Sequence, residues 1–180
     1  MERMNRNVLK RILIIGYMSL IFVIVGWLFF QSRKPETLPI GSPMPKIGFI
    51  TANSSDSLGS DRIHKTIVVL FSPDCDHCKF QLKRFDNDIK ELANVRIFLL
   101  TTDEDFFSGN DIHSWPALES SSNVEWGIVK KGEIKQNFGR LALPSIFLFD
   151  ENGVLFYKIK GEVMLRIVLN KLYGLNRVRG

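Results

Sequence analysis

The most constraining feature of the sequence is a pair of cysteines set between a predicted strand and a predicted helix. Cys75 and Cys78 are the two cysteines of the chain, and they lie in the stretch FSPDCDHCKFQ. Directly before the pair, residues 66–71 read TIVVLF, a β-branched and apolar run that is typical of a strand buried on both faces of a sheet. After it, apolar side chains recur with the spacing of the inward face of an amphipathic helix, at Cys78, Leu82, Phe85, Ile89 and Leu92.

This arrangement predicts different surroundings for the two thiols. Cys78 belongs to the buried stripe, whereas Cys75 is expected at the helix N-terminus, where unpaired backbone N–H groups and the helix dipole stabilise an anion. A thiolate on Cys75 can attack a disulfide, and Cys78 can then resolve the mixed disulfide. The spacing and the flanking elements therefore favour thiol-disulfide exchange.

A cysteine pair can also form a structural disulfide or bind a metal. A structural disulfide is not needed for stability, because a domain of roughly 140 residues can bury a sufficient core without one. A closed zinc site needs about four ligands, and the other candidates are His77, His64 and His113, the last two in loop-like surroundings that favour polar surface residues. We expect no metal ligands here, and no cofactor beyond a redox-active disulfide between Cys75 and Cys78.

A second constraint is an uncharged apolar run near the N-terminus. Residues 12–30 read ILIIGYMSLIFVIVGWLFF, and a helix of that length spans roughly the 30 Å hydrocarbon core of a bilayer. A cleaved signal peptide has a shorter apolar core and a small-residue cleavage site, and the following QSRKPETLPIG has no such site. We expect an uncleaved anchor, and the basic residues in 1–11 predict a cytoplasmic N-terminus with the rest of the chain outside.

The charge distribution argues against nucleic acid as a partner. The formal net charge is +5, but six of the 24 basic and two of the 19 acidic residues lie before residue 38, which leaves a net charge of +1 for residues 38–180. A basic surface for phosphate backbones is not indicated. We divide the chain into a cytoplasmic N-terminus (1–11), a transmembrane anchor (12–30), a proline-containing linker (31–39) and one domain (40–180).

The segments around and after the cysteines resemble the thioredoxin superfamily, in particular its membrane-anchored TlpA/ResA-like branch of extracytoplasmic thiol-disulfide oxidoreductases. The resemblance covers roughly residues 40–173. The family's strand and active-site turn correspond to VVLFSPDCDHC, and its next parallel strand corresponds to VRIFLLTTDED (95–105). The family's proline and strand hairpin are similar to LPSIFLFDENGVLFYKIKG, which is followed by a closing helix over 163–173. The resemblance implies an α/β fold, a thioredoxin-like central mixed sheet flanked by helices and preceded by a single N-terminal transmembrane helix.

The resemblance also implies a substrate-binding segment. In the family, the matching proline is cis and lies against the two cysteines, and the backbone groups of the preceding residue pair with an extended substrate segment. In this sequence Pro144 and Leu143 take these positions. Cys75 is expected to attack and Cys78 to resolve.

The sequence departs from the family where proton acceptors are expected. The acid that many thioredoxins place six residues before the first cysteine is Val69 here, and the acid that the ResA-like pattern places three residues after the second cysteine is Gln81. The base for Cys78 is therefore not identified by sequence.

Three charged residues around Cys75 are expected to modulate its reactivity in opposite directions. His77 matches the histidine of the C-P-H-C turn of the DsbA-like proteins, and an imidazolium there would stabilise a thiolate. Asp74, which replaces the usual tryptophan, and Asp76 would oppose the thiolate by like-charge repulsion. These opposing charges leave the reduction potential open.

The predicted function is that of a membrane-anchored extracytoplasmic thiol-disulfide oxidoreductase, which reduces disulfides in partner proteins through Cys75 and Cys78. Its expected partners are protein thiols and disulfides outside the cytoplasm, a membrane electron donor of the thiol-transfer type, and the lipid bilayer. The expected location is the cytoplasmic (inner) membrane, single-pass, with the domain on the periplasmic side. The alternative is a thioredoxin-fold module that carries copper on the two cysteines and a histidine and metallates a membrane oxidase.

Overall fold

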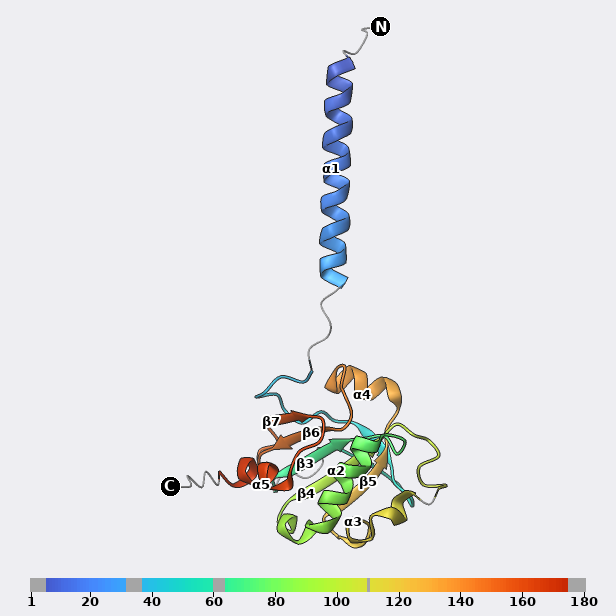
Figure 1. Ribbon diagram of the computed structural model, residues 1–180, viewed down its shortest axis with the longest axis vertical. Helices are drawn as coiled ribbons and strands as arrows, with labels where there is room; N and C mark the ends of the chain where they lie inside the picture. Colours follow the sequence, from blue (N-terminus) through green and yellow to red (C-terminus); the bar gives the residue numbers. More distant parts are fainter. Residues whose placement is uncertain (1–5, 32–36, 60–63, 110, 175–180) are drawn as a thin grey trace. The chain divides into compact units, whose positions relative to one another are not determined.

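A computed structural model describes residues 6–31, 37–59, 64–109 and 111–174 of the chain. The chain divides into two compact units, Met1–Pro35 and Glu36–Gly180. The first contains the helix α1, Arg6–Gln31. The second contains seven strands and the remaining helices (Figure 1).

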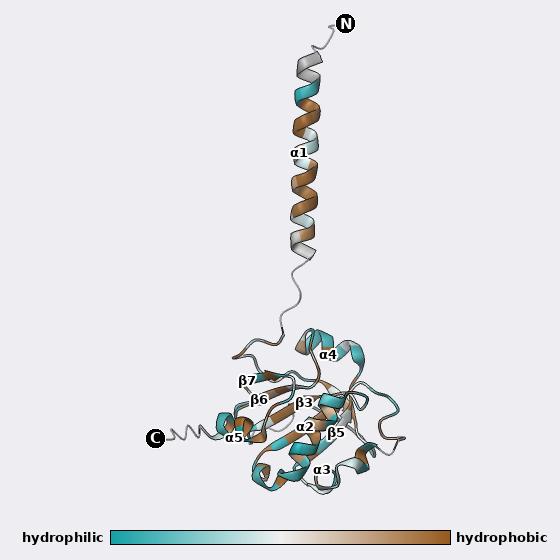
Figure 2. Ribbon diagram, viewed as in Figure 1, coloured by the Kyte–Doolittle hydropathy of each residue, from teal (hydrophilic) through white to brown (hydrophobic). Residues whose placement is uncertain are grey.

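Helix α1 carries one stretch, Lys10–Leu28, that is long and apolar enough to cross a membrane, with a mean hydropathy of 2.2. It is the one such helix in the described part of the chain. Its side chains from residue 10 to residue 28 are exposed within the structure, and Figure 2 shows its hydrophobic colouring. The helix predicted over residues 12–30 is thus present, and its composition suits either a membrane anchor or a signal sequence.

The second unit is built on a mixed seven-stranded sheet. The strands lie in the order β2-β1-β5-β4-β3-β6-β7. The central strands β3, β4 and β5 run parallel to one another, and the edge pairs β1–β2 and β6–β7 are antiparallel. In chain order the strands are β1 (Gly48–Ile50), β2 (Ser55–Ser57), β3 (Thr66–Leu70), β4 (Arg96–Thr101), β5 (Val124–Ile128), β6 (Ser145–Phe149) and β7 (Leu155–Lys160).

Helices cover both faces of this sheet, so every residue of β3 is buried, as its continuous apolar run predicted. Because successive side chains of a strand point to opposite faces, Val69 packs in a cluster with α2, α3 and α5, whereas Val68 packs in a second cluster with Phe138 of α4. The helical segments are α2 (Asp76–Asn87), α3 (Pro116–Ser120), α4 (Lys131–Phe138), α5 (Leu165–Tyr173) and the 3-10 turns η1 (Ile89–Leu92) and η2 (Asp111–Ser114).

Two predicted helices differ from the observed ones at their ends. The stripe after the cysteines is buried throughout, but α2 ends at Asn87, and η1 carries Ile89 and Leu92 after a non-helical Asp88 with φ −120° and ψ 25°. Aspartate and asparagine favour such helix ends because their side chains compete for backbone hydrogen bonds. The closing helix, predicted over 163–173, begins at Leu165.

The segment before β1 also packs on the sheet. The backbone N–H of Leu38 donates to the carbonyl of Phe138 at 3.2 Å, and the Lys158 ammonium donates to Thr37 Oγ1 at 2.8 Å. Thr37 and Leu38, which we assigned to the linker 31–39, therefore contact the domain. These contacts connect the start of the domain to the end of α4 and to β7.

Candidate active site: the Cys75–Cys78 turn

The turn between β3 and α2 places Cys75 at the start of a helix, as the sequence predicted. Cys75 is the N-cap residue of α2, with extended backbone angles (φ −92°, ψ 114°). Its Sγ accepts a hydrogen bond from the backbone N–H of Cys78 at 3.3 Å. The first turn of a helix leaves such N–H groups unpaired, so negative charge on this sulfur is stabilised by the backbone.

The two thiols differ sharply in exposure. Cys75 is partly exposed and Cys78 is completely buried, and both are free thiols. Burial raises the pKa of Cys78 to about 12, and its hydrogen bond and charge interaction with Cys75 act in the same direction, partly offset by a backbone hydrogen bond involving Ser72. Cys75 is therefore the sulfur that an external disulfide can reach, and Cys78 is held as a thiol until a proton acceptor removes its proton.

The loop before β6 lies against Cys75. The Leu143–Pro144 peptide bond is cis, which confirms the expectation drawn from the family resemblance. The Leu143 carbonyl lies 3.9 Å from Cys75 Sγ, although the two residues are 68 positions apart in the chain. The Leu143 side chain is 39% exposed, whereas Pro144 is buried and its carbonyl accepts from the N–H of Gly161 at 2.8 Å.

The charged residues that we expected to modulate Cys75 lie in solvent at the rim of the turn. Asp74, Asp76 and His77 are all exposed. His77 Nδ1 is 3.8 Å from Glu162 Oε1, in a pair in which the His77 side chain is 74% exposed. No pattern in the sequence indicates Glu162, which follows β7 and reaches the turn only because the sheet places the end of β7 beside the start of α2.

The two positions at which the resemblance to thioredoxins led us to look for an acid hold uncharged side chains inside the core. Val69 is fully buried in β3. Gln81 is fully buried one turn after Cys78, and its Oε1 accepts the backbone N–H of Val163 at 2.6 Å. Its Nε2 has no hydrogen-bond partner among the described residues. Neither residue is a proton acceptor for Cys78, in agreement with the sequence.

A buried acid that the sequence did not reveal positions the neighbouring helix. Asp86 is 5% exposed, and its Oδ1 accepts the backbone N–H groups of Ala117 at 2.8 Å and Leu118 at 3.0 Å. These N–H groups belong to the first turn of α3, so Asp86 of α2 ties α3 to the helix that carries the cysteines. Lys83 lies 3.4 Å from the other carboxylate oxygen.

The remaining histidines stand apart from the cysteines. His64 is exposed, and His113 lies 3.0 Å from the Glu119 carboxylate. Across the described ranges, no three His, Cys, Asp or Glu side chains gather into a group that could hold a metal ion.

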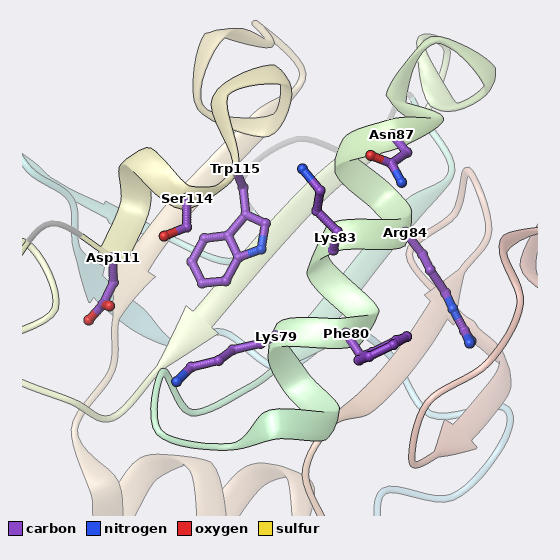
Figure 3. Close-up of a pocket in the computed structure, with 8 residues that line it drawn as sticks. All are labelled: Lys79, Phe80, Lys83, Arg84, Asn87, Asp111, Ser114 and Trp115. Atoms are coloured by element: carbon purple, nitrogen blue, oxygen red, sulfur yellow. The ribbon is translucent and has the colours of Figure 1, made fainter.

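Two hollows flank the reactive turn. One, of about 390 Å³, lies against the outer surface of α2, where Figure 3 shows Lys79 and Lys83 on the side that faces Trp115, with Phe80 and Arg84 on the other side of the helix. The other, of about 370 Å³, lies beside Leu143 and is bordered by α4. Both hollows combine apolar side chains with cations.

No protein-family model matches the chain, and no curated protein matches it in sequence. Solved structures do match its fold. A peroxiredoxin-like protein from Aquifex aeolicus is 18% identical with a TM-score of 0.62, covering 78% of this chain and 89% of its own. A thiol:disulfide interchange protein from Bacteroides sp. is 18% identical with a TM-score of 0.61, covering 78% and 94%.

A third match is the exposed lipoprotein thioredoxin Etrx1 of Streptococcus pneumoniae, which is 16% identical with a TM-score of 0.58 and covers 73% of this chain and 100% of its own. At this level of sequence identity, the similarity is one of fold, that is, of the path of the backbone. In this chain that path includes the parallel β3, β4 and β5, the antiparallel β6–β7 hairpin and the helix α2, whose N-cap is Cys75. The second unit of this chain therefore has a thioredoxin-like fold.

Proposed function

We propose that this protein is a thiol-disulfide oxidoreductase that reduces disulfides in partner proteins through Cys75 and Cys78. The observation that supports the proposal most strongly is the pairing of a partly exposed Cys75 at a helix start with a fully buried Cys78 one turn later. Structural neighbours that are described as a thiol:disulfide interchange protein and a thioredoxin give further support.

The chemistry proceeds in two exchanges. The Cys75 thiolate attacks one sulfur of the client disulfide, which forms a mixed disulfide and releases the other client sulfur as a thiolate. Cys78, after losing its proton, attacks Cys75 Sγ and releases the second client thiol. The client gains two electrons and two protons, and the protein is left with a Cys75–Cys78 disulfide, which a membrane dithiol donor reduces again.

The cis-proline loop is the proposed docking point for the client. The Leu143 carbonyl is beside Cys75 Sγ, and the Leu143 side chain is exposed. An extended client segment can pair with this backbone and so present its disulfide to Cys75. Leu143 and Pro144 are thus the proposed substrate-binding residues.

The test of this function is a trapping experiment. Cys78→Ser removes the resolving thiol, so mixed disulfides between Cys75 and client proteins should accumulate and disappear on treatment with a reducing agent. Cys75→Ser is the matched control and should trap none. Adducts of Cys75→Ser together with none of Cys78→Ser would reverse the assigned roles, and no adducts in either variant would argue against the function.

We also propose that residues 12–30 anchor the protein in the cytoplasmic membrane, with the domain outside the cytoplasm. The uncharged apolar run and the basic residues that precede it support this topology. The intact chain should fractionate with membranes, and protease added from the periplasmic side should digest the domain. A soluble protein that lacks its N-terminal segment would show instead that this segment is a cleaved signal.

A further inference from the structure

The hollow beside Leu143 is a groove with an apolar floor and a basic rim. Its volume is about 370 Å³, within the range of small ligand sites. Ile134, Leu141 and Leu143 are its incompletely buried apolar side chains. Leu70, Phe71 and Leu100 lie beneath them and are buried. The groove therefore offers apolar surface that no part of the described chain covers.

Two residues that line the groove, Leu143 and Phe71, adjoin the reactive turn. Leu143 has its carbonyl 3.9 Å from Cys75 Sγ. Phe71, at the base of the groove, directly follows β3 and begins the turn that leads to Cys75. Helix α4, drawn in orange in Figure 1, and the loop after it supply the remaining wall. A polypeptide whose disulfide lies at Cys75 would thus place its neighbouring side chains in this groove.

The charged side chains that line the groove in the described part of the chain are cations. Lys131 and Lys135 are four residues apart on α4, and therefore share a face of that helix, and Arg140 follows its C-terminus. All three are exposed, and none forms an ion pair with an acidic residue in the described part of the chain. Among the residues that the structure describes, no aspartate or glutamate lines the groove.

The two other hollows described for this structure each contain an acidic residue. The hollow along α2 is lined by three cations, Lys79, Lys83 and Arg84, and by one acid, Asp111. A larger hollow, at β1 and β2, is bordered by three acids, Asp56, Glu104 and Glu133, and by one lysine, Lys130. Of these three hollows, the one next to Leu143 therefore differs in that its described lining holds cations and no acid.

We propose that this groove selects client proteins in which apolar and acidic side chains flank the disulfide that Cys75 attacks. The apolar side chain would cover Leu141 and Leu143, and the carboxylates would lie against Lys131, Lys135 and Arg140. Such complementary charges speed encounter and discriminate against partners of the same sign. The inference rests on the proposed oxidoreductase function and adds the chemistry of its substrates.

The test uses the full-length protein, reduced and held in an uncharged detergent, and two synthetic peptides with one internal disulfide each. The peptides share a leucine beside the disulfide and differ in the next residues, which are glutamates in one and lysines in the other. We expect the glutamate peptide to be reduced about tenfold faster at low salt, because charge complementarity raises association rates by at least about that factor. The preference should shrink as salt screens the charges.

Two double variants distinguish the effect of the groove's lysines on the peptide preference from the effect of the protein's net charge. Lys131→Glu with Lys135→Glu should abolish or reverse the preference. Lys46→Glu with Lys90→Glu makes the same change in net charge on exposed residues outside the groove, and should preserve it. An uncharged disulfide such as dithiodipyridine should react equally with all variants, which verifies that the reactive thiol is intact.

Each other outcome has a separate meaning. Equal rates for the two peptides would overturn the inference and leave the oxidoreductase function standing. A preference that survives in the groove variant, or that is lost equally in the control variant, would also overturn it, because the selecting charges would lie elsewhere. A protein that reacts with dithiodipyridine but reduces neither peptide would contradict the proposed function itself.

Discussion

The burial of Cys78 should make the resolution step strongly dependent on pH. Burial is the main cause that raises the pKa of Cys78 from 9.0 to about 12. Each pH unit below the pKa lowers the fraction of thiolate tenfold, so about one Cys78 in a hundred thousand is ionised near pH 7. This fraction is roughly a thousandfold smaller than that of a cysteine with the ordinary pKa at the same pH. Neither Gln81 nor Val69 can accept the proton. Resolution should therefore accelerate about tenfold per unit between about pH 7 and pH 10.

Stopped-flow reaction of the reduced protein with an uncharged disulfide can isolate this step. Attack by Cys75 is second order, so its rate rises with the concentration of the disulfide, whereas resolution by Cys78 is first order and independent of it. Acid quenching followed by mass spectrometry identifies the mixed disulfide between the two phases. The slope of the logarithm of the resolution rate against pH is the quantity to compare with the expected value near one.

Cys78→Ser is the control for this experiment and should show the attack phase alone at every pH. Circular dichroism at each pH checks that the domain stays folded. Burial, the largest cause of the raised pKa of Cys78, persists in the mixed disulfide, whereas the smaller contribution from the charge of Cys75 is lost there, so any flattening of the slope should begin near pH 10. A resolution rate that does not change with pH would refute the reasoning, because another group would then be removing the proton from Cys78.

Two further predictions concern the surroundings of the turn. Asp86→Ala should lower the free energy of unfolding by about 2 to 4 kcal/mol in urea titrations, because two backbone N–H groups of α3 lose their buried acceptor. Asp86→Asn keeps an acceptor oxygen and should lower the free energy of unfolding less. An Ala variant as stable as the wild type would contradict the capping role of Asp86. Asp74→Asn should make the couple more oxidising, by no more than about 20 mV in a glutathione titration, because removing an exposed negative charge stabilises the thiolate by at most about 1 kcal/mol. His77→Ala should shift the potential the other way, and equal shifts in both variants would exclude a charge effect.

The local elements around the cysteines were predictable from the sequence because each depends on neighbours in the chain. The apolar run of β3 indicates burial on both faces, and the spacing after Cys78 indicates one buried helix face. A cysteine before that stripe is expected at the helix start, where α2 has it. The apolar run of α1 is likewise a local pattern, and the cis bond before Pro144 followed from the resemblance to a family.

The contacts that complete the site join residues far apart in the chain, and only the tertiary structure brings them together. The Leu143 carbonyl reaches Cys75 across 68 positions because β6 pairs with β3. Asp86 binds the start of α3, more than 30 positions later, and Glu162 reaches His77 from the end of β7. The spacing of apolar residues indicates whether a side chain faces the core, but it does not indicate which distant segment packs against that side chain. The basic groove of Lys131, Lys135 and Arg140 also depends on contacts between distant segments, because the folded sheet brings α4 next to the loop that contacts Cys75.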